Sequence, residues 1–384
     1  MTVYVDVAPE LLMWAVDRAG WDEFEIAKKE PRLHEWVGGQ KKPTLKQLQK
    51  FSHSTHTPFG LLFLPEPPEE EIPIPDMRTI GNVAVGRPSA DLLDTIHLCQ
   101  ERQDWYRWYA RDNDFEPVGF IGSAALTDRP EKVALEIREI LEFDKEKRKM
   151  FYRWEDSLSY LLHAIEGLGV MVMINGIVGS NTNRKLDPNE FRGFALADPL
   201  APLIFVNGAD TKSAQIFTLT HELAHLWLGH SALSDMQLAN RDVPDEELWC
   251  NYVAAEVLVP LREFEVAYRG ETTVAELERL AKEFKVSTLV ILRRIYDASL
   301  LSWNDYRKQY IEERERVLEL YVGNESTGGG NFYNSQMRRL GRRFGRAVVS
   351  SVYEGSTSFR EGYQLLGTRK HDTFTNLAAK LLET

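Results

Sequence analysis

Residues 216–229, IFTLTHELAHLWLG, contain the feature that most constrains how this chain can fold. His221 and His225 are four positions apart, so in a helix they lie about one turn apart on one face and can converge on one cation. Nearly every other position is apolar, which indicates a helix buried on most sides. Burying two imidazoles and a carboxylate without partners would cost several kcal/mol in order of magnitude, so we expect a metal to compensate them.

This spacing is that of two zinc ligands, with Glu222 placed beside them as a general base. Zinc held by few protein groups keeps a position open for water and lowers the pKa of that water to roughly 7. Glu222 can then accept the proton and pass it to a leaving amine. A pattern with three fixed letters also arises by chance, so a structural histidine pair or a degenerate site is the alternative.

A third ligand is expected from a second predicted helix, residues 246–259, EELWCNYVAAEVLV. Its candidates are Glu246, Glu247 and Glu256. Glu247 and Asn251 share a face, whereas Glu256 lies about half a turn around the helix, so Glu247 and Glu256 cannot both face one metal. We predict that Glu247 is the ligand and that Asn251 orients a histidine. Glu256 is expected to be salt-bridged or solvated.

The two stretches together, HELAHLWLGH and then EELWCNYVAAEVLVP, resemble the ImmA/IrrE family of bacterial and phage metallopeptidases. That family combines HExxH with a Glu-containing helix that ends in Asn-x-Phe-Ala-Ala-x-Leu-Leu-x-Pro. The resemblance implies that the zinc ligands are His221, His225 and Glu247, and that the general base is Glu222.

Two positions depart from the family pattern: Cys250 stands where Ala is usual, and Val253 where Phe is usual. Both residues are small or apolar and suit a buried helix face. Cys250 could coordinate a metal, but we expect a buried, inert thiol. His230, after the first helix, is expected to cap that helix or to face solvent rather than to contact substrate.

Composition limits the class of protein. At 384 residues and 43% apolar content the chain should form two or three domains. It lacks both a run of about 18 apolar residues and a signal-like N-terminus, which predicts a soluble, cytoplasmic protein without membrane contact. Cys99 and Cys250 give no disulfide framework. The net charge of −12 argues against a protein that generally coats nucleic acid.

The predicted fold class is α+β and mostly helical: a zincin-like peptidase core with a small sheet, flanked by helix-turn-helix-like domains. Strands are expected within 169–179, 191–197 and 203–207, before the HExxH helix, whose N-terminal cap is expected from residues 210–213. Helices are expected over 130–143 and 148–166. An extended substrate is expected to bind as an added strand along an edge of the sheet. The expected domains are an Xre/Cro-like helix-turn-helix domain at 1–64, a Pro-rich acidic linker at 65–78, a helical connector at 79–167, the zinc metallopeptidase core at 168–268, a helix-turn-helix-like segment at 269–302, and a helical C-terminal region with a basic helix at 303–384.

Residues 1–64 resemble Xre/Cro-type domains, with Trp36 and the loop 38–45 at the family's places. In that family the second helix of the pair enters the major groove. Here that helix, near 31–37, looks several residues too short. The segment also has eight Lys/Arg and eight Asp/Glu, so it offers few phosphate contacts. DNA binding and a module for protein contacts both remain open.

Two later segments could contact nucleic acid. In residues 272–302, Arg293 and Arg294 could meet phosphates, but a packed helical pair that supports the site is favoured. After the flexible break expected at 323–330, residues 331–370 carry a net charge of +6. Their arginines, expected in one short helix, could bind nucleic acid, an acidic partner or the chain's own acidic surface. These arginines are Arg338, Arg339, Arg342, Arg343 and Arg346.

The predicted function is a Zn²⁺-dependent endopeptidase that regulates by cutting a specific protein. By resemblance, its partner is a helix-turn-helix repressor. The alternative is a DNA-binding transcriptional regulator or antitoxin whose zinc site is mainly structural, with DNA and a cognate toxin as partners.

Overall fold

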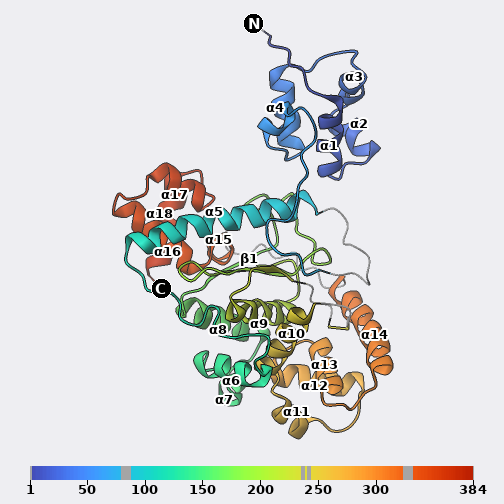
Figure 1. The fold of residues 1–384 in the computed structure, drawn as a ribbon, viewed down its shortest axis with the longest axis vertical. Coiled ribbons are helices and arrows are strands. Elements are labelled where there is room, and N and C mark those ends of the chain that lie inside the picture. Colours follow the sequence, from blue (N-terminus) through green and yellow to red (C-terminus); the bar gives the residue numbers. More distant parts are fainter. Residues whose placement is uncertain (1, 79–87, 235–237, 240–243, 323–331, 384) are drawn as a thin grey trace. The chain divides into compact units, whose positions relative to one another are not determined.

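The computed structural model describes residues 2–78, 88–234, 238–239, 244–322 and 332–383 (Figure 1). The predicted break at 323–330 therefore lies outside the described residues. The chain divides into two compact units, Met1–Pro73 with Val85–Ile96 and Ile74–Ala84 with His97–Thr384. No described helix is both long enough and apolar enough to cross a lipid bilayer.

The first unit is a small helical module. Its elements are α1 (Pro9–Arg18), α2 (Glu23–Lys29), α3 (Leu33–Val37), α4 (Leu45–Ser54), the 3₁₀ helix η1 (Phe59–Phe63) and the start of α5 (Ala90–Asp112). Trp21 and Trp36 each contact Phe51 edge-on, with ring centroids 6.1 Å apart. Lys41 and Lys42 form ion pairs within this unit. The helix that the resemblance would place in a DNA groove, α3, is five residues long.

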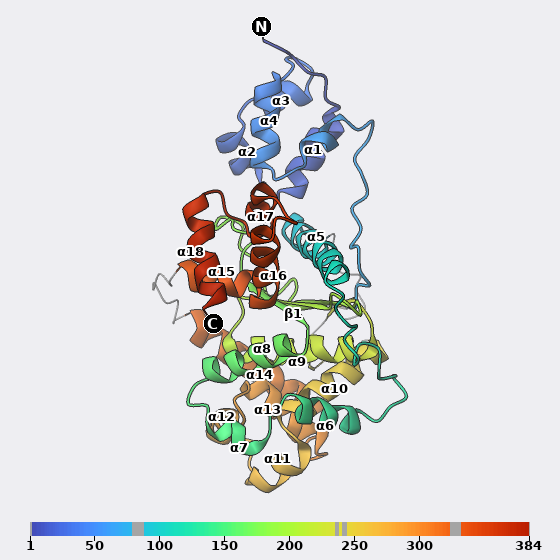
Figure 2. The ribbon, with the colours of Figure 1, turned by 90° about the vertical axis from the view of Figure 1, so that its left-hand side faces the viewer.

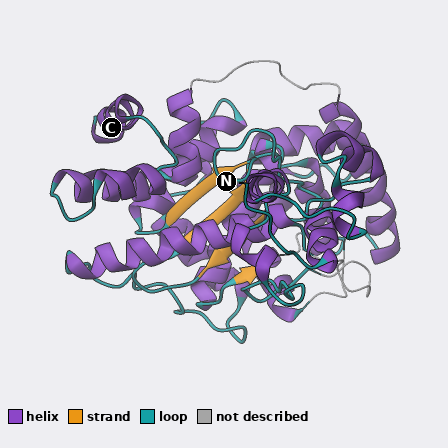
Figure 3. Ribbon diagram, turned by 90° about the horizontal axis from the view of Figure 1, so that it is seen from above, coloured by secondary structure: helices purple, strands orange, loops and turns teal. Residues whose placement is uncertain are grey.

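The second unit is built around a mixed four-stranded sheet, seen from above in Figure 3. The strands are β1 (Met171–Asn175), β2 (Gly193–Leu196), β3 (Leu203–Asn207) and β4 (Ala232–Leu233), and their order is β1-β3-β2-β4. β3 is parallel to β1 and antiparallel to β2, which is in turn antiparallel to β4. Each of the three predicted strand segments contains one strand. The two-residue β4 was not predicted, because so short a strand has no alternation to detect.

Helices cover both faces of this sheet. α8 (Trp154–Gly167) and α9 (Lys212–Leu228) pack on one face, and the other is covered by α5, α15 (Phe332–Leu340) and α16 (Arg342–Tyr353) (Figures 1 and 2). Every strand residue is buried, as expected for a sheet covered on both sides. The α+β, mostly helical fold class is confirmed.

Below α9 lies a second layer of helices (Figure 1). α10 (Asp245–Leu258) packs against both α9 and α6 (Pro130–Ile140). The same layer contains α7 (Lys145–Lys149), α11 (Leu261–Ala267), α12 (Val274–Phe284) and α13 (Thr288–Asp297), followed by α14 (Trp303–Val322). The last two helices, α17 (Phe359–Leu365) and α18 (His371–Leu382), lie beside α16 on the other side of the sheet. The single helix predicted over 148–166 is wrong: α7 ends at Lys149, and α8 begins at Trp154 with Asp156 capping it.

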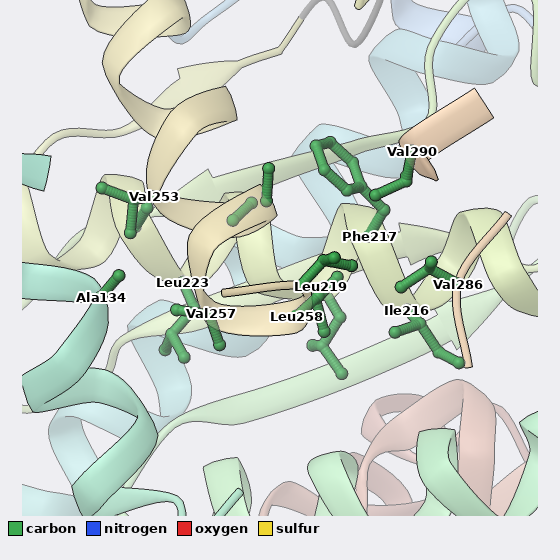
Figure 4. Close-up of a cluster of buried hydrophobic side chains, with 14 of the residues drawn as sticks. Ala134, Ile216, Phe217, Leu219, Leu223, Val253, Val257, Leu258, Val286 and Val290 are labelled. Carbon is green, nitrogen blue, oxygen red and sulfur yellow. The ribbon is translucent and has the colours of Figure 1, made fainter. Parts of the chain in front are cut away.

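The apolar core connects these helices to the sheet. Ile216, Leu219 and Leu223 of α9 are fully buried, together with Val257 and Leu258 of α10 (Figure 4). Because one continuous cluster holds both helices, the side chains on their facing sides have little freedom to move.

Both edges of the sheet are occupied by other segments of the same unit. At β4, the Leu233 N–H donates to the Pro75 carbonyl, and the Met77 N–H donates to the Leu233 carbonyl, both at 2.9 Å. At β1, Gly341 adopts φ 72°, and a Cβ there would lie 2.6 Å from the Val172 carbonyl oxygen. Neither edge is therefore free for an added substrate strand at these residues.

Replacing a core leucine tests this packing. Leu161→Ala in α8 removes a fully buried side chain and should lower the free energy of unfolding by about 2–5 kcal/mol. Leu135→Ala in α6, where the side chain is 52% exposed, is the matched control and should change it by less than about 0.5 kcal/mol. Urea unfolding followed by circular dichroism measures both, and equal effects would contradict the placement of α8.

Candidate metal centre

The helix α9 carries the HExxH residues into the interior. The Thr211 side chain caps its first turn by accepting from the Ala214 N–H, as predicted, and Gly229 ends it at φ 74°. Every residue from 215 to 228 is buried. The histidines are thus held by a rigid, fully packed helix and not by a loop.

The structure brings the three predicted ligands together. The Nε2 atoms of His221 and His225 are 3.1 Å apart. Glu247, from α10, places Oε2 3.3 Å from His221 Nε2 and Oε1 3.2 Å from His225 Nε2. All three residues are completely buried, and among the described residues they form the single group whose geometry could hold a metal ion.

These side chains are not satisfied by the protein alone. Both Glu247 carboxylate oxygens, His221 Nδ1 and Asn251 Oδ1 are buried without a hydrogen-bond partner among the described residues. The short distances from Glu247 to the histidines do not meet hydrogen-bond geometry. An unpaired buried carboxylate is costly, so the cluster fits a site that is completed by a cation.

The protonation of the cluster suits a cation at two of its three side chains. Burial lowers the pKa of His221, which leaves the imidazole neutral at pH 7. Burial alone would raise the pKa of Glu247, but the contacts with His221 and His225 lower it to about 2, so this carboxylate is ionised. Metal ligands must be neutral imidazoles and ionised carboxylates. Burial alone would lower the pKa of His225, but contacts with Cys250, Glu246 and Glu247 raise it well above its usual value, so a cation would have to displace a proton from this imidazole.

Glu222 is fully buried beside this cluster. The Ser234 hydroxyl donates to Oε2 at 3.2 Å, whereas Oε1 has no partner among the described residues. Burial raises the pKa of Glu222 to about 8, close to the value at which a carboxyl exchanges protons at neutral pH. Gly193 of β2 makes room for it, since a Cβ there would lie 2.6 Å from Thr218 and 3.1 Å from Glu222 Oε1. Sequence reasoning missed Ser234 and Gly193, although a glycine within a strand is a known signal of close approach.

Glu246 lies behind the histidines and is not a candidate ligand in this structure. Its carboxylate accepts hydrogen bonds from His225 Nδ1 at 3.0 Å and from the half-exposed His230 Nδ1 at 2.9 Å. A carboxylate in this position fixes the tautomer and the orientation of a ligating imidazole. From the sequence, Glu246 is only a candidate for the third metal ligand, because its contact with His225 depends on how α10 packs.

Two further residues of α10 border the cluster. Asn251 is buried and interacts with the His221 side chain, which raises the pKa of His221 against the larger effect of burial. Its role in orienting that histidine stays a prediction. Cys250 is fully buried, and burial raises the pKa of its thiol to about 11, which agrees with the expected inert thiol.

Glu256 is salt-bridged, as expected. It pairs with Arg294 and accepts a hydrogen bond from the Leu261 N–H at 3.2 Å. Arg294 is fully buried, and Arg293 pairs with Asp297 and donates to the Leu238 carbonyl. Internal partners take both side chains, so the structure gives no support to phosphate contacts by these two arginines. α12 and α13 pack against each other, as the preferred interpretation of a packed helical pair expects, and the role of this pair in supporting the site stays a prediction.

The prediction that the five C-terminal arginines lie in one helix is wrong. Gly341 separates α15, with Arg338 and Arg339, from α16, with Arg342, Arg343 and Arg346. All five side chains are half-buried. Arg343 donates to the Glu166 carbonyl and Arg346 to the Leu381 carbonyl, so two of them contact the chain itself. Their contacts with nucleic acid or a partner stay a prediction.

The role of Glu246 can be tested by metal binding. Glu246→Gln should weaken metal affinity by about 10–100-fold, because His225 loses its carboxylate partner. The control is Asp245→Asn, which changes an exposed neighbour on the same helix and should leave the affinity unchanged. Competition with a zinc-sensitive dye measures both, and equal affinities of the two variants would contradict this role.

Comparison with known families agrees with this geometry. Residues 165–296 match the model of the M78 peptidase family, described as an IrrE N-terminal-like domain. This range contains all four strands, α9 and α10. Residues 340–380 match a second model, described only as a domain of unknown function, DUF8813.

No curated protein and no solved structure matches the chain. The match over 165–296 covers the cluster of His221, His225 and Glu247, and it supports the ImmA/IrrE family and a metallopeptidase-type function for this chain.

Proposed function

We propose that this chain is a zinc-dependent endopeptidase of the HExxH type. The zinc ligands would be His221, His225 and Glu247, and the general base would be Glu222. The observation that carries the proposal is the buried group of His221, His225 and Glu247, in which both Glu247 carboxylate oxygens lack a hydrogen-bond partner among the described residues.

The separations of these atoms support zinc. Zinc lies about 2.0–2.2 Å from nitrogen and carboxylate oxygen, so two ligands at tetrahedral angles are about 3.3–3.5 Å apart. Here the two Nε2 atoms are 3.1 Å apart, Glu247 Oε2 lies 3.3 Å from His221 Nε2, and Glu247 Oε1 lies 3.2 Å from His225 Nε2. These distances involve both carboxylate oxygens and are close to that range. Three protein ligands of this kind are typical of catalytic zinc, which keeps a position open, whereas structural zinc usually has four.

Zinc bound there would supply the Lewis acidity that polarises a peptide carbonyl and acidifies water. The protein side chains supply the proton transfers. Among the described residues Oε1 of Glu222 has no partner, so in its ionised form this carboxylate can accept a proton from water, while Ser234 holds Oε2 in place. The same carboxyl then donates that proton to the leaving amine. Glu246 keeps His225 in the tautomer that leaves Nε2 available.

The proposed substrate is a specific regulatory protein, such as a transcriptional repressor, cut in a segment that can extend. This part of the proposal rests on the resemblance to ImmA/IrrE proteins. The described residues give less support to the DNA-binding alternative, because Arg293 and Arg294 are taken by internal partners.

Glu222→Gln separates the two functions. The variant should keep its zinc, because Glu222 is not one of the grouped ligands, and should lose cleavage by about 10²–10⁴-fold, because the amide cannot accept the proton. Protein N-termini should be compared between cells that express the wild type and cells that express the variant, with and without DNA damage. Zinc content is measured on the purified proteins.

A new N-terminus that depends on Glu222 would identify the substrate. If no N-terminus differs under either condition while zinc is retained, the regulator or antitoxin with a structural zinc site becomes the better account. Loss of zinc from the variant would show that Glu222 is a ligand and not the base.

A further inference from the structure

A cavity of 240 Å³ lies at the amino-terminal end of α9. Part of its rim is exposed, including Leu318 at 47%, so a ligand could enter it from solvent. Its walls come from α9, α13, α14, Leu238 and the loops that precede β2 and α9. The apolar side chains that line it include Phe217, Leu238, Leu289, Val290, Tyr310 and Val317.

The cavity begins next to two groups of the proposed catalytic site. Phe217 lies one helical turn before His221, and their ring centroids are 6.3 Å apart. Arg192 also lines the cavity, and the next residue is Gly193, which touches Glu222. His221 and Glu222 are fully buried, so a peptide reaches them only after the surrounding structure opens. A side chain next to the reacting bond could then enter this space.

The walls are fixed by contacts within the protein. The Leu238 carbonyl accepts hydrogen bonds from Tyr306 Oη at 2.9 Å and from Arg293 at 2.8 Å. Val290 and Phe217 are buried in the same core cluster and are labelled together in Figure 4.

Three charged residues line the cavity: Arg192 and Asp210 lie close to each other, and Arg314 is exposed to solvent. Arg192 Nε lies 3.5 Å from Asp210 Oδ2, and Asp210 Oδ1 accepts a hydrogen bond from the Thr211 N–H. The interior is thus suited to an apolar group rather than to a charged one.

Building on the proposed peptidase function, we propose that this cavity binds a large apolar side chain of the substrate, such as Leu, Met or Phe, on a residue next to the scissile bond. An apolar protein cavity of about 150 Å³ is known to accept benzene, so 240 Å³ is sufficient for these side chains. The enzyme would select an extended segment with a large apolar residue at the cut.

Filling the cavity tests this proposal. Ala214 lines it from α9, and Ala214→Leu adds three carbons there; Val317→Phe fills it from the opposite wall, on α14. Val266→Phe is the matched control, since that valine is 84% exposed on α11. The second filling variant keeps the test valid if the first does not fold.

Binding is measured first, because it does not require turnover. Leucine hydroxamate and alanine hydroxamate are titrated by calorimetry into each zinc-loaded protein. Wild type and Val266→Phe should bind the leucine compound at least about tenfold more tightly, and the filling variants should lose that preference. Equal affinities in the wild type, a preference that survives both filling variants, or failure of both compounds to bind would overturn the proposal.

Cleavage is then profiled on a peptide library made from digested cell proteins, with Glu222→Gln as the inactive control. Wild-type cuts should be enriched in Leu, Met or Phe on one side of the bond, and the filling variants should shift this position to smaller residues. Cleavage that depends on Glu222 but has no apolar preference would overturn the cavity's role and leave the peptidase. Absence of such cleavage with the leucine preference intact would instead count against the peptidase function.

Discussion

The buried contact between α9 and α10 is the interaction on which the site depends. It places two imidazoles against the ionised carboxylate of Glu247, with all three side chains fully buried. Such a group is unfavourable alone, so the packing of Leu223, Val257 and the surrounding core must hold it in place until a cation completes it. On its other side α9 packs against β2 and β3, so the sheet completes the burial of this helix.

Much of the site could be predicted because it is local. The four-residue spacing of His221 and His225 fixes their face of the helix, and the same argument separates Glu247 from Glu256 on α10. The three longer strands, the cap of α9 by Thr211 and the α+β class also followed from short-range patterns.

What could not be predicted depends on contacts between distant segments. Ser234 reaches Glu222 only because β4 returns beside β2, and Glu246 acts on His225 only after α10 has docked. A charge pattern does not show whether an arginine faces solvent, and Arg294 proved to be enclosed by Glu256, Asp297 and the Val259 carbonyl. The break between α15 and α16 depends on how closely Gly341 approaches Val172.

The complete burial of His221, Glu222, His225 and Glu247 has a consequence for exchange with solvent. A chelator or an incoming peptide cannot touch these groups until the structure around them opens. The rate of metal loss should then reach a plateau as chelator concentration rises, because opening and not capture becomes the slow step. The plateau rate of metal loss would then equal the rate at which the site opens.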